Sequence, residues 1–187
     1  MKIDLNPSFD GMHGALGAIV YKTFDGQEIA SPLPKPTDNP PSAPQVRQQN
    51  RFADANEYAP MVSADPVLKA PYLAAAKAEG VSTVFALMMG DYLKPPTVTE
   101  VDLYYYHGRI GDRVRIRATD DFEVVGVTVS IRTEAGVVLE SGPAVKKGPI
   151  WIYTAQTVAP VDQDLTIEAE ASDRAENSRT LSEGWHA

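Results

Sequence analysis

The stretch that decides the fold is Arg113-Val114-Arg115-Ile116-Arg117-Ala118, in which charged and apolar residues alternate one by one. The same alternation returns in residues 125–131 and 165–171. Successive side chains of a strand point to opposite faces, so this pattern predicts strands with one buried face and one solvent face. Several such segments, separated by short acidic and glycine-containing turns, are typical of two sheets that pack face to face.

Working outward from this stretch, we expect seven strands in the last part of the chain. They are predicted at residues 98–105, 112–118, 124–133, 137–144, 150–155, 165–171 and 178–181. Seven short strands at this spacing match the number and rhythm of an immunoglobulin-like (Ig-like) domain. The predicted fold class is therefore α+β, mainly β, with an Ig-like antiparallel β-sandwich over residues 97–187.

The first 41 residues differ in composition from the rest. They are rich in glycine and proline, and residues 31–41 contain a proline at nearly every second position. Proline lacks the amide donor and favours the extended polyproline II conformation, so we expect an extended arm at residues 1–41. Residues 18–24 and 27–30, on either side of Asp25-Gly26, are expected to form a small hairpin within this arm.

Residues 42–96 are expected to form short helices. Ser42 and Gln45 match a capping box, which predicts that the first helix begins there, and Pro60 is expected to end it. Asp65-Pro66 restarts the chain, and Ser82 is expected to cap a third helix. Short, partly apolar helices are marginally stable alone, so these should pack on the sandwich or on another subunit.

Composition excludes several classes of protein. The chain has 187 residues, a net charge of -8 and no cysteine. A nucleic-acid partner is not expected, because such proteins concentrate Lys and Arg to neutralise phosphates. The absence of cysteine excludes a disulfide framework and a thiolate nucleophile. The longest apolar run, residues 84–89, is too short for a membrane span.

The first ten residues contain no apolar core of the length found in signal peptides. We therefore expect cytoplasmic synthesis without a signal peptide, which leaves association with a particle open. No catalytic pattern is found in the sequence either. His13, His107 and His186 share no metal-ligand spacing, and the sequence contains none of the common hydrolase, kinase or dinucleotide-binding motifs. The sequence predicts a protein that is not an enzyme and needs no cofactor.

Candidate interface residues come from three places. The run Tyr104-Tyr105-Tyr106-His107 is the most aromatic part of the chain, and alternation along a strand should expose at least one of its tyrosines. The alternative is a half-buried strand, since tyrosine favours strands in general. Trp185 lies beyond the last predicted strand and either tucks back on its own domain or docks into a neighbour. The arm contributes the remaining candidates, Pro32, Pro34 and Pro36.

Acidic residues gather in two predicted loops that should lie at the same end of the sandwich. They are Asp120, Asp121 and Glu123 in one loop and Asp173, Glu176 and Asn177 in the other. Oxygen donors from two loops suit calcium, with Asp120, Asp121, Asp173 and Asn177 as candidate ligands. The alternative is that Asp and Asn occupy turns because their side chains accept hydrogen bonds from nearby amides.

The last half of the chain resembles bacterial Ig-like domains of the adhesin and cadherin-like kind. The resemblance rests on the acidic pair Asp120-Asp121 before a valine-rich strand, on the aromatic strand at residues 151–154, and on residues 169–178. It implies the Ig-like fold. The sequence departs from the family at Glu176, where the family has glycine. Residues 14–26 and 39–52 are similar to the opening segment of uncharacterised bacterial and phage-associated proteins.

The function expected from these observations is structural. We expect a subunit or decoration of a larger protein assembly, such as a phage or injection-type particle, whose arm contacts protein partners or further copies of the chain. Two alternatives stay open. One is an adhesion or carbohydrate- or protein-binding module, stiffened by calcium. The other is a hydrolase, supported only by the abundance of Asp and Glu.

Overall fold

A computed structural model describes residues 13–24, 27–35, 40–79 and 83–186. The described chain is mainly β, with antiparallel sheets and three helices. It divides into two compact units, Met1–Ser42 and Ala43–Ala187, which we call the N-terminal and C-terminal units. The helices and strands of residues 42–96 and 97–187, which the sequence analysis treated as separate segments, thus belong almost entirely to one unit.

The N-terminal unit contains a three-stranded antiparallel sheet in the order β1-β2-β3. Its strands are β1 (Gly14–Leu16), β2 (Ile19–Phe24) and β3 (Gln27–Pro32). The expected hairpin corresponds to β2 and β3, and β1 is an additional strand that the sequence analysis left within the arm. Among the proline candidates, Pro32 ends β3, Pro34 is exposed in the following coil, and Pro36 lies outside the described residues.

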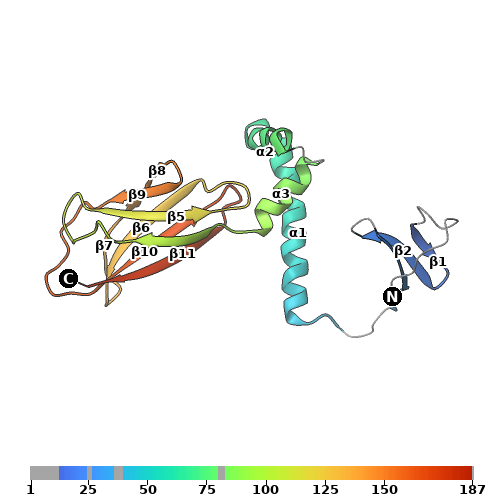
Figure 1. Ribbon diagram of the computed structural model, residues 1–187, viewed down its shortest axis with the longest axis horizontal. Coiled ribbons are helices and arrows are strands. Elements are labelled where there is room, and N and C mark those ends of the chain that lie inside the picture. Colours follow the sequence, from blue (N-terminus) through green and yellow to red (C-terminus); the bar gives the residue numbers. More distant parts are fainter. Residues whose placement is uncertain (1–12, 25–26, 36–39, 80–82, 187) are drawn as a thin grey trace. The chain divides into compact units, whose positions relative to one another are not determined.

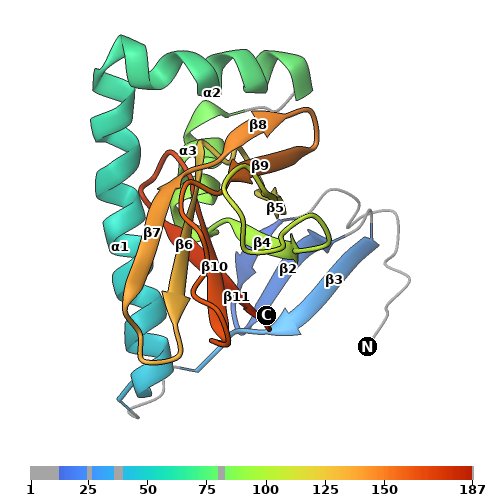
Figure 2. The same ribbon diagram turned by 90° about the vertical axis from the view of Figure 1, so that its left-hand side faces the viewer.

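The C-terminal unit begins with three helices, shown in Figure 1: α1 (Ala43–Ala64), α2 (Pro66–Glu79) and α3 (Val84–Leu93). The expectation that Pro60 ends the first helix is wrong, since α1 continues through Pro60 to Ala64. Burial of Ala59 and Val62 on either side of the proline offsets the hydrogen bond that it cannot donate. Figure 2 shows α2 turning sharply away from the end of α1.

Asp65 separates α1 from α2, as the sequence indicated. Its carboxylate accepts hydrogen bonds from the amides of Val67, at 2.7 Å, and Leu68, at 3.4 Å, which caps the start of α2. No helix in the described part of the chain is long and apolar enough to cross a membrane.

Two four-stranded antiparallel sheets form the rest of the C-terminal unit, with strand orders β11-β10-β6-β7 and β4-β5-β9-β8. We call this part, residues 97–185, the two-sheet domain. The strands are β4 (Thr97–Asp102), β5 (Arg113–Thr119), β6 (Gly126–Thr133), β7 (Val138–Pro143), β8 (Val145–Lys147), β9 (Ile150–Thr154), β10 (Leu165–Ser172) and β11 (Ser178–Trp185). Each of the seven expected strands is present, although the first ends at Asp102 and not at residue 105, and β8 is an eighth.

The core of the two-sheet domain follows the alternation seen in the sequence. In β5, Val114 and Ile116 are fully buried, while Arg117 faces solvent and pairs with Glu100 of β4 at 2.8 Å. The buried members of both sheets form one cluster. Its fully or almost fully buried aliphatic members are Val114, Ile116, Val127, Val129, Ile131, Ala155, Leu165, Ile167, Ala169 and Ala171. The same residues therefore determine both the strands and the core between them.

The helices pack at one end of the two-sheet domain rather than over a sheet face (Figure 1). That end is formed by the loop between β5 and β6 and the loop between β10 and β11. Phe122, from the first loop, packs in the helical core of Ala59, Val62, Tyr72 and Met88. Its ring stacks on that of Tyr72, with centroids 4.4 Å apart. The helical core is therefore completed by the strand-bearing part of the chain.

Candidate functional site

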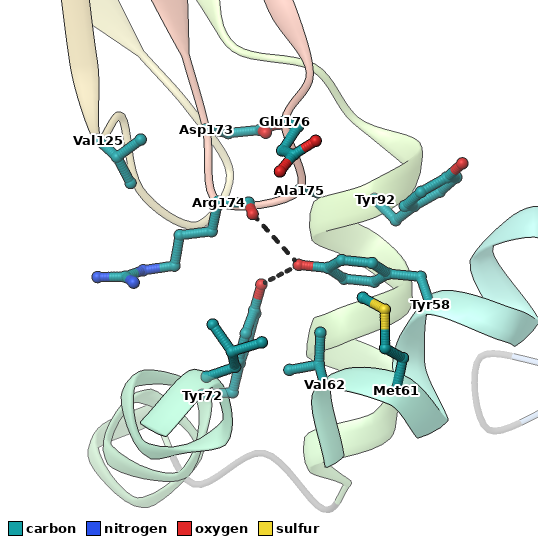
Figure 3. Close-up of a pocket in the computed structure, with 11 residues that line it drawn as sticks. Tyr58, Met61, Val62, Tyr72, Tyr92, Val125, Asp173, Arg174, Ala175 and Glu176 are labelled. Atoms are coloured by element: carbon teal, nitrogen blue, oxygen red, sulfur yellow. Dashed lines mark hydrogen bonds between the residues drawn. The ribbon is translucent and has the colours of Figure 1, made fainter. Parts of the chain in front are cut away.

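A pocket of about 660 Å³ lies where the helices meet the β10–β11 loop. We call it the tyrosine pocket, and Figure 3 shows it. It is lined by Tyr58, Met61, Val62, Leu68, Tyr72, Tyr92, Val125, Asp173, Arg174, Ala175 and Glu176. All three helices contribute a tyrosine. The rings make the helical wall, and the loop supplies the charged groups opposite.

A chain of hydrogen bonds runs along the pocket floor. The Tyr72 hydroxyl donates to Oδ2 of Asp91 on α3. The Tyr58 hydroxyl lies 3.0 Å from the Tyr72 hydroxyl and 3.5 Å from the backbone carbonyl of Arg174, and its single proton is shared between these two acceptors (Figure 3). One polar chain thus joins α3, α2, α1 and the β10–β11 loop.

Asn177 joins the same loop to the end of α3. Its side-chain amide donates to the backbone carbonyls of Asp91 and Tyr92, each at 3.2 Å, and to Oδ2 of Asp173, at 2.7 Å. The backbone amide of Asn177 also donates to Oδ1 of Asp173, at 2.8 Å. These bonds satisfy carbonyls that the end of a helix leaves without partners. They hold the loop against α3 and so set the shape of the pocket.

Asp91 is an unusual group for this position. It is 1% exposed, and its Oδ1 atom has no hydrogen-bond partner in the structure. Burial raises the pKa of Asp91 to about 6, the hydrogen bond from Tyr72 opposes that rise, and the nearby charges of Asp173 and Asp120 add to it. Burial also raises the pKa of Asp173. A carboxyl that takes up a proton near neutral pH therefore sits beneath the pocket.

The phenol groups of Tyr58 and Tyr72 stay neutral. Burial raises the pKa of Tyr58, and the negative charges of Asp91 and Asp173 add to that rise. The pKa of Tyr72 is raised far above its ordinary value by burial and by the hydrogen bond to Asp91. Neutral hydroxyls that are both donors and acceptors, on flat apolar rings, suit binding of a ligand with an apolar body.

The charged residues of the loop differ in their partners. The Arg174 side chain binds Glu123, with nitrogen-to-oxygen distances of 2.7 and 2.8 Å. Figure 3 shows its guanidinium directed away from Tyr58 and Tyr92. Glu176 has a backbone φ of 62°, in the left-handed region that favours glycine. The turn therefore has a backbone geometry that favours glycine but carries a glutamate.

The structure brings part of the predicted acidic cluster together. Asp120 and Asp173 lie at the same end of the domain and are close enough for their charges to interact. Asn177 binds Asp173, whereas Asp121 forms an ion pair with Lys94 after α3. Among the described residues, no group of three or more His, Cys, Asp or Glu side chains is placed to hold a metal ion. Calcium binding stays a prediction that this geometry does not support.

The turn role of these residues is visible in hydrogen bonds. Asp120 accepts from the amides of Phe122 and Glu123, at 3.0 and 2.9 Å. Together with the bonds between Asp173 and Asn177, this is the alternative that the sequence analysis left open, in which acidic side chains shape the loops.

The expectation that the run at residues 104–107 lies on a strand is wrong, since β4 ends at Asp102 and the run follows it. Two of the aromatic candidates are exposed, Tyr106 is buried, and Trp185, at the end of β11, is half-buried. Tyr104 and Tyr105 are 78% and 48% exposed, and their rings meet edge to face with centroids 4.9 Å apart. Tyr106 is 3% exposed, and Trp185 packs on it and donates to its backbone carbonyl at 3.1 Å. Within this chain Trp185 therefore tucks back on its own domain, which removes it and Tyr106 as exposed interface residues. His107 is exposed and lies 4.0 Å from Asp112.

Sequence reasoning missed the tyrosine pocket. Tyr58, Tyr72 and Tyr92 were ordinary members of helical segments, and nothing in their spacing relates them to Arg174 or Glu176. One signal was available. Asp91 is the one charged residue in the apolar stretch from residue 84 to residue 93, and a lone carboxyl there indicates either a helix end or a buried polar site.

Comparison with known proteins leaves the function open. No protein-family model and no curated protein matches the chain. The crystal structure of an engineered protein is 21% identical over 49% of this chain and 20% of that chain, with a TM-score of 0.37. A conjugative transposon lipoprotein from Bacteroides eggerthii is 15% identical over 49% of this chain and 95% of that chain, with a TM-score of 0.26. At these TM-scores neither match informs the fold or the function.

Proposed function

We propose that this protein is a non-catalytic subunit of a larger protein assembly, in which an Ig-like sandwich is the platform and the N-terminal unit is the attachment element. The observation that carries the proposal is the three-stranded sheet of the N-terminal unit. Within that unit, the described residues form no helix and no second sheet that could cover it. A sheet of three strands is at the lower limit of independent stability, so covering its apolar face with a partner would stabilise it.

The register of this sheet supports an apolar contact surface. Leu16 pairs with Ile19, and Ile19 pairs with Pro32, so the three residues lie side by side on one face. Leu16 is 59% exposed and Ile19 is 42% exposed. Burial of each large aliphatic side chain against a partner would contribute about 1.5–3 kcal/mol. Leu33, which directly follows β3, is also exposed, at 47%.

The platform part of the proposal has separate support. The two four-stranded antiparallel sheets of the two-sheet domain share one core, as the sheets of a sandwich do. The C-terminal unit also contains its own helical core, so it has what a platform needs to fold without the arm.

The test is the native mass of the full chain, measured by light scattering over a range of concentrations. We expect a mass above that of the monomer, and a fall to the monomer mass when residues 1–41 are deleted. Leu16→Ser should weaken assembly, whereas Ala15→Ser, on the opposite face of the same strand, should not. An unchanged mass after the deletion would sink the proposal.

A second candidate function, an adhesion or binding module, is favoured by the exposed aromatic pair. Tyr104 and Tyr105 form an exposed aromatic pair, and the Arg115 guanidinium lies 5.7 Å from the Tyr105 ring centre. Such a module would bind its ligand as the isolated C-terminal unit. Binding of that unit on a glycan array, lost on Tyr104→Ala, would support it, and an equal signal from the variant would count against it.

A further inference from the structure

Glu176 combines two features that its place in the fold does not require. Its φ of 62° puts a side chain where the backbone favours glycine. Among the described residues, its carboxylate forms no ion pair or hydrogen bond, although it lines the tyrosine pocket. A strained residue whose side chain contributes nothing to the fold suggests a role in binding.

The charge of the pocket is unbalanced. Glu176 and Asp173 both line it, and the one cationic side chain there, Arg174, is already bound to Glu123. The carboxylates of Asp91 and Asp173 add to the raised pKa of Tyr58, which indicates a negative potential at the pocket floor. A cation would therefore be attracted to the pocket, and an anion repelled.

The rings of the pocket fit a flat cation on an apolar stem. Tyr58 and Tyr92 lie with ring centroids 5.1 Å apart and planes inclined by 39°, which forms an angled aromatic wall. Figure 3 shows Glu176 at the mouth of the pocket, above Tyr58, with Tyr92 beside it. Guanidinium groups stack on aromatic faces and pair with carboxylates at the same time.

We propose that the tyrosine pocket binds an arginine side chain of a partner protein, with the guanidinium against Tyr58 and Tyr92 and paired with Glu176. The rim favours a protein as the source of the arginine. Met61, Leu68 and Val125 are 58%, 45% and 44% exposed around the opening, which leaves apolar surface for the residues that flank the arginine. This inference rests on the proposed role in protein assembly and names the chemistry of one contact.

The test uses the full chain, observed by two-dimensional amide NMR during titration with the blocked peptide acetyl-Ala-Ala-Arg-Ala-Ala-amide. We expect saturable shifts at Ala175, Glu176 and Tyr92. The matched control peptide carries citrulline, which has the shape of arginine without its charge, and should bind at least about tenfold more weakly. Agmatine, a free guanidinium compound, should also bind more weakly than the arginine peptide.

Variants separate the binding contacts from the fold. Glu176→Gln should weaken the binding of the arginine peptide by about twofold to fivefold, the range expected for one partly exposed ion pair. Tyr92→Ala should weaken the binding of this peptide by a similar factor. Glu176→Gly should weaken peptide binding at least as much as Glu176→Gln does. Glycine fits the left-handed backbone at this position, so loss of binding in this variant is not due to a strained loop. Glu183→Gln, an exposed glutamate on β11, is the control and should leave binding unchanged.

Several results would overturn the inference. The first is that the citrulline peptide binds as tightly as the arginine peptide. The second is that agmatine binds more tightly than the arginine peptide. The third is that the amide shifts occur only at residues away from the tyrosine pocket. Failure of the proposed function has a different readout, since it leaves the native mass unchanged on deletion of residues 1–41. Peptide binding can thus fail while the mass still depends on the arm, or the reverse.

Discussion

The buried carboxyl of Asp91 makes the stability of the fold depend on pH in an unusual direction. Most paired carboxylates stabilise proteins as pH rises, because their pKa is lower in the folded state. Asp91 has the opposite shift, to about 6 from an ordinary value of 3.8. The groups that face it are Tyr72 on α2, Asp120 in the β5–β6 loop, and Asp173 and Arg174 in the β10–β11 loop.

The size of the effect follows from the two pKa values. The folded state binds the proton more tightly, so the contribution of Asp91 to stability is complete below pH 3.8 and is lost as pH rises through about 6. The difference of about 2.2 pKa units corresponds to about 3 kcal/mol at full ionisation. Between pH 4 and pH 8 the folded state should lose about 2.4 kcal/mol of that amount.

Asp91→Asn isolates this contribution. The amide has the shape of the carboxyl, its oxygen can accept from Tyr72, and it does not ionise. We expect the free energy of unfolding by urea, measured at pH 4 and pH 8, to fall by about 2 kcal/mol more in the wild type than in the variant. The comparison cancels the titration of those acidic groups that do not interact with Asp91. An identical fall in both proteins would refute the reasoning that places a high-pKa carboxyl at this position.

Three further changes test the geometry of the loops by urea unfolding. Glu176→Gly should raise the free energy of unfolding by about 0.5–1 kcal/mol, because glycine relieves the left-handed backbone, and a decrease would contradict this. Gly108→Ala should lower it by about 2–4 kcal/mol, since φ is +76° and the added methyl would lie 2.9 Å from the Trp185 ring; an unchanged value would argue against that packing. Asn177→Ala should lower it by about 1–3 kcal/mol through the lost bonds to the end of α3, and a negligible effect would mean that other contacts hold the loop.

The strands of the two-sheet domain were predictable because the information that specifies them is local. In β5 the alternation of arginine with Val114 and Ile116 predicts which face is buried, and both residues are fully buried in the structure. Helix ends were less predictable. Proline at position 60 is a breaker in an isolated helix, but the neighbouring buried residues Ala59 and Val62 keep α1 helical to Ala64.

The aromatic residues show where local reasoning ends. Alternation predicted that the tyrosines of the run at 104–106 would face different ways along a strand, but β4 ends at Asp102 and the run lies in a turn, where strand alternation does not apply. Trp185, 79 residues further along the chain, covers Tyr106 and leaves Tyr104 exposed. The exposure of these residues therefore depends on a contact between the two ends of the domain.

The sequence by itself determined the hairpin of β2 and β3, seven strands of the two-sheet domain and the three helical segments, since each depends on residues that are neighbours in the chain. The tyrosine pocket was decided only by the tertiary structure. Tyr58 and Arg174 are 116 residues apart and meet because Asn177 and the buried Asp91 hold the β10–β11 loop against α3. Periodicity describes which face of an element is buried, and it contains no information about which distant element will cover that face.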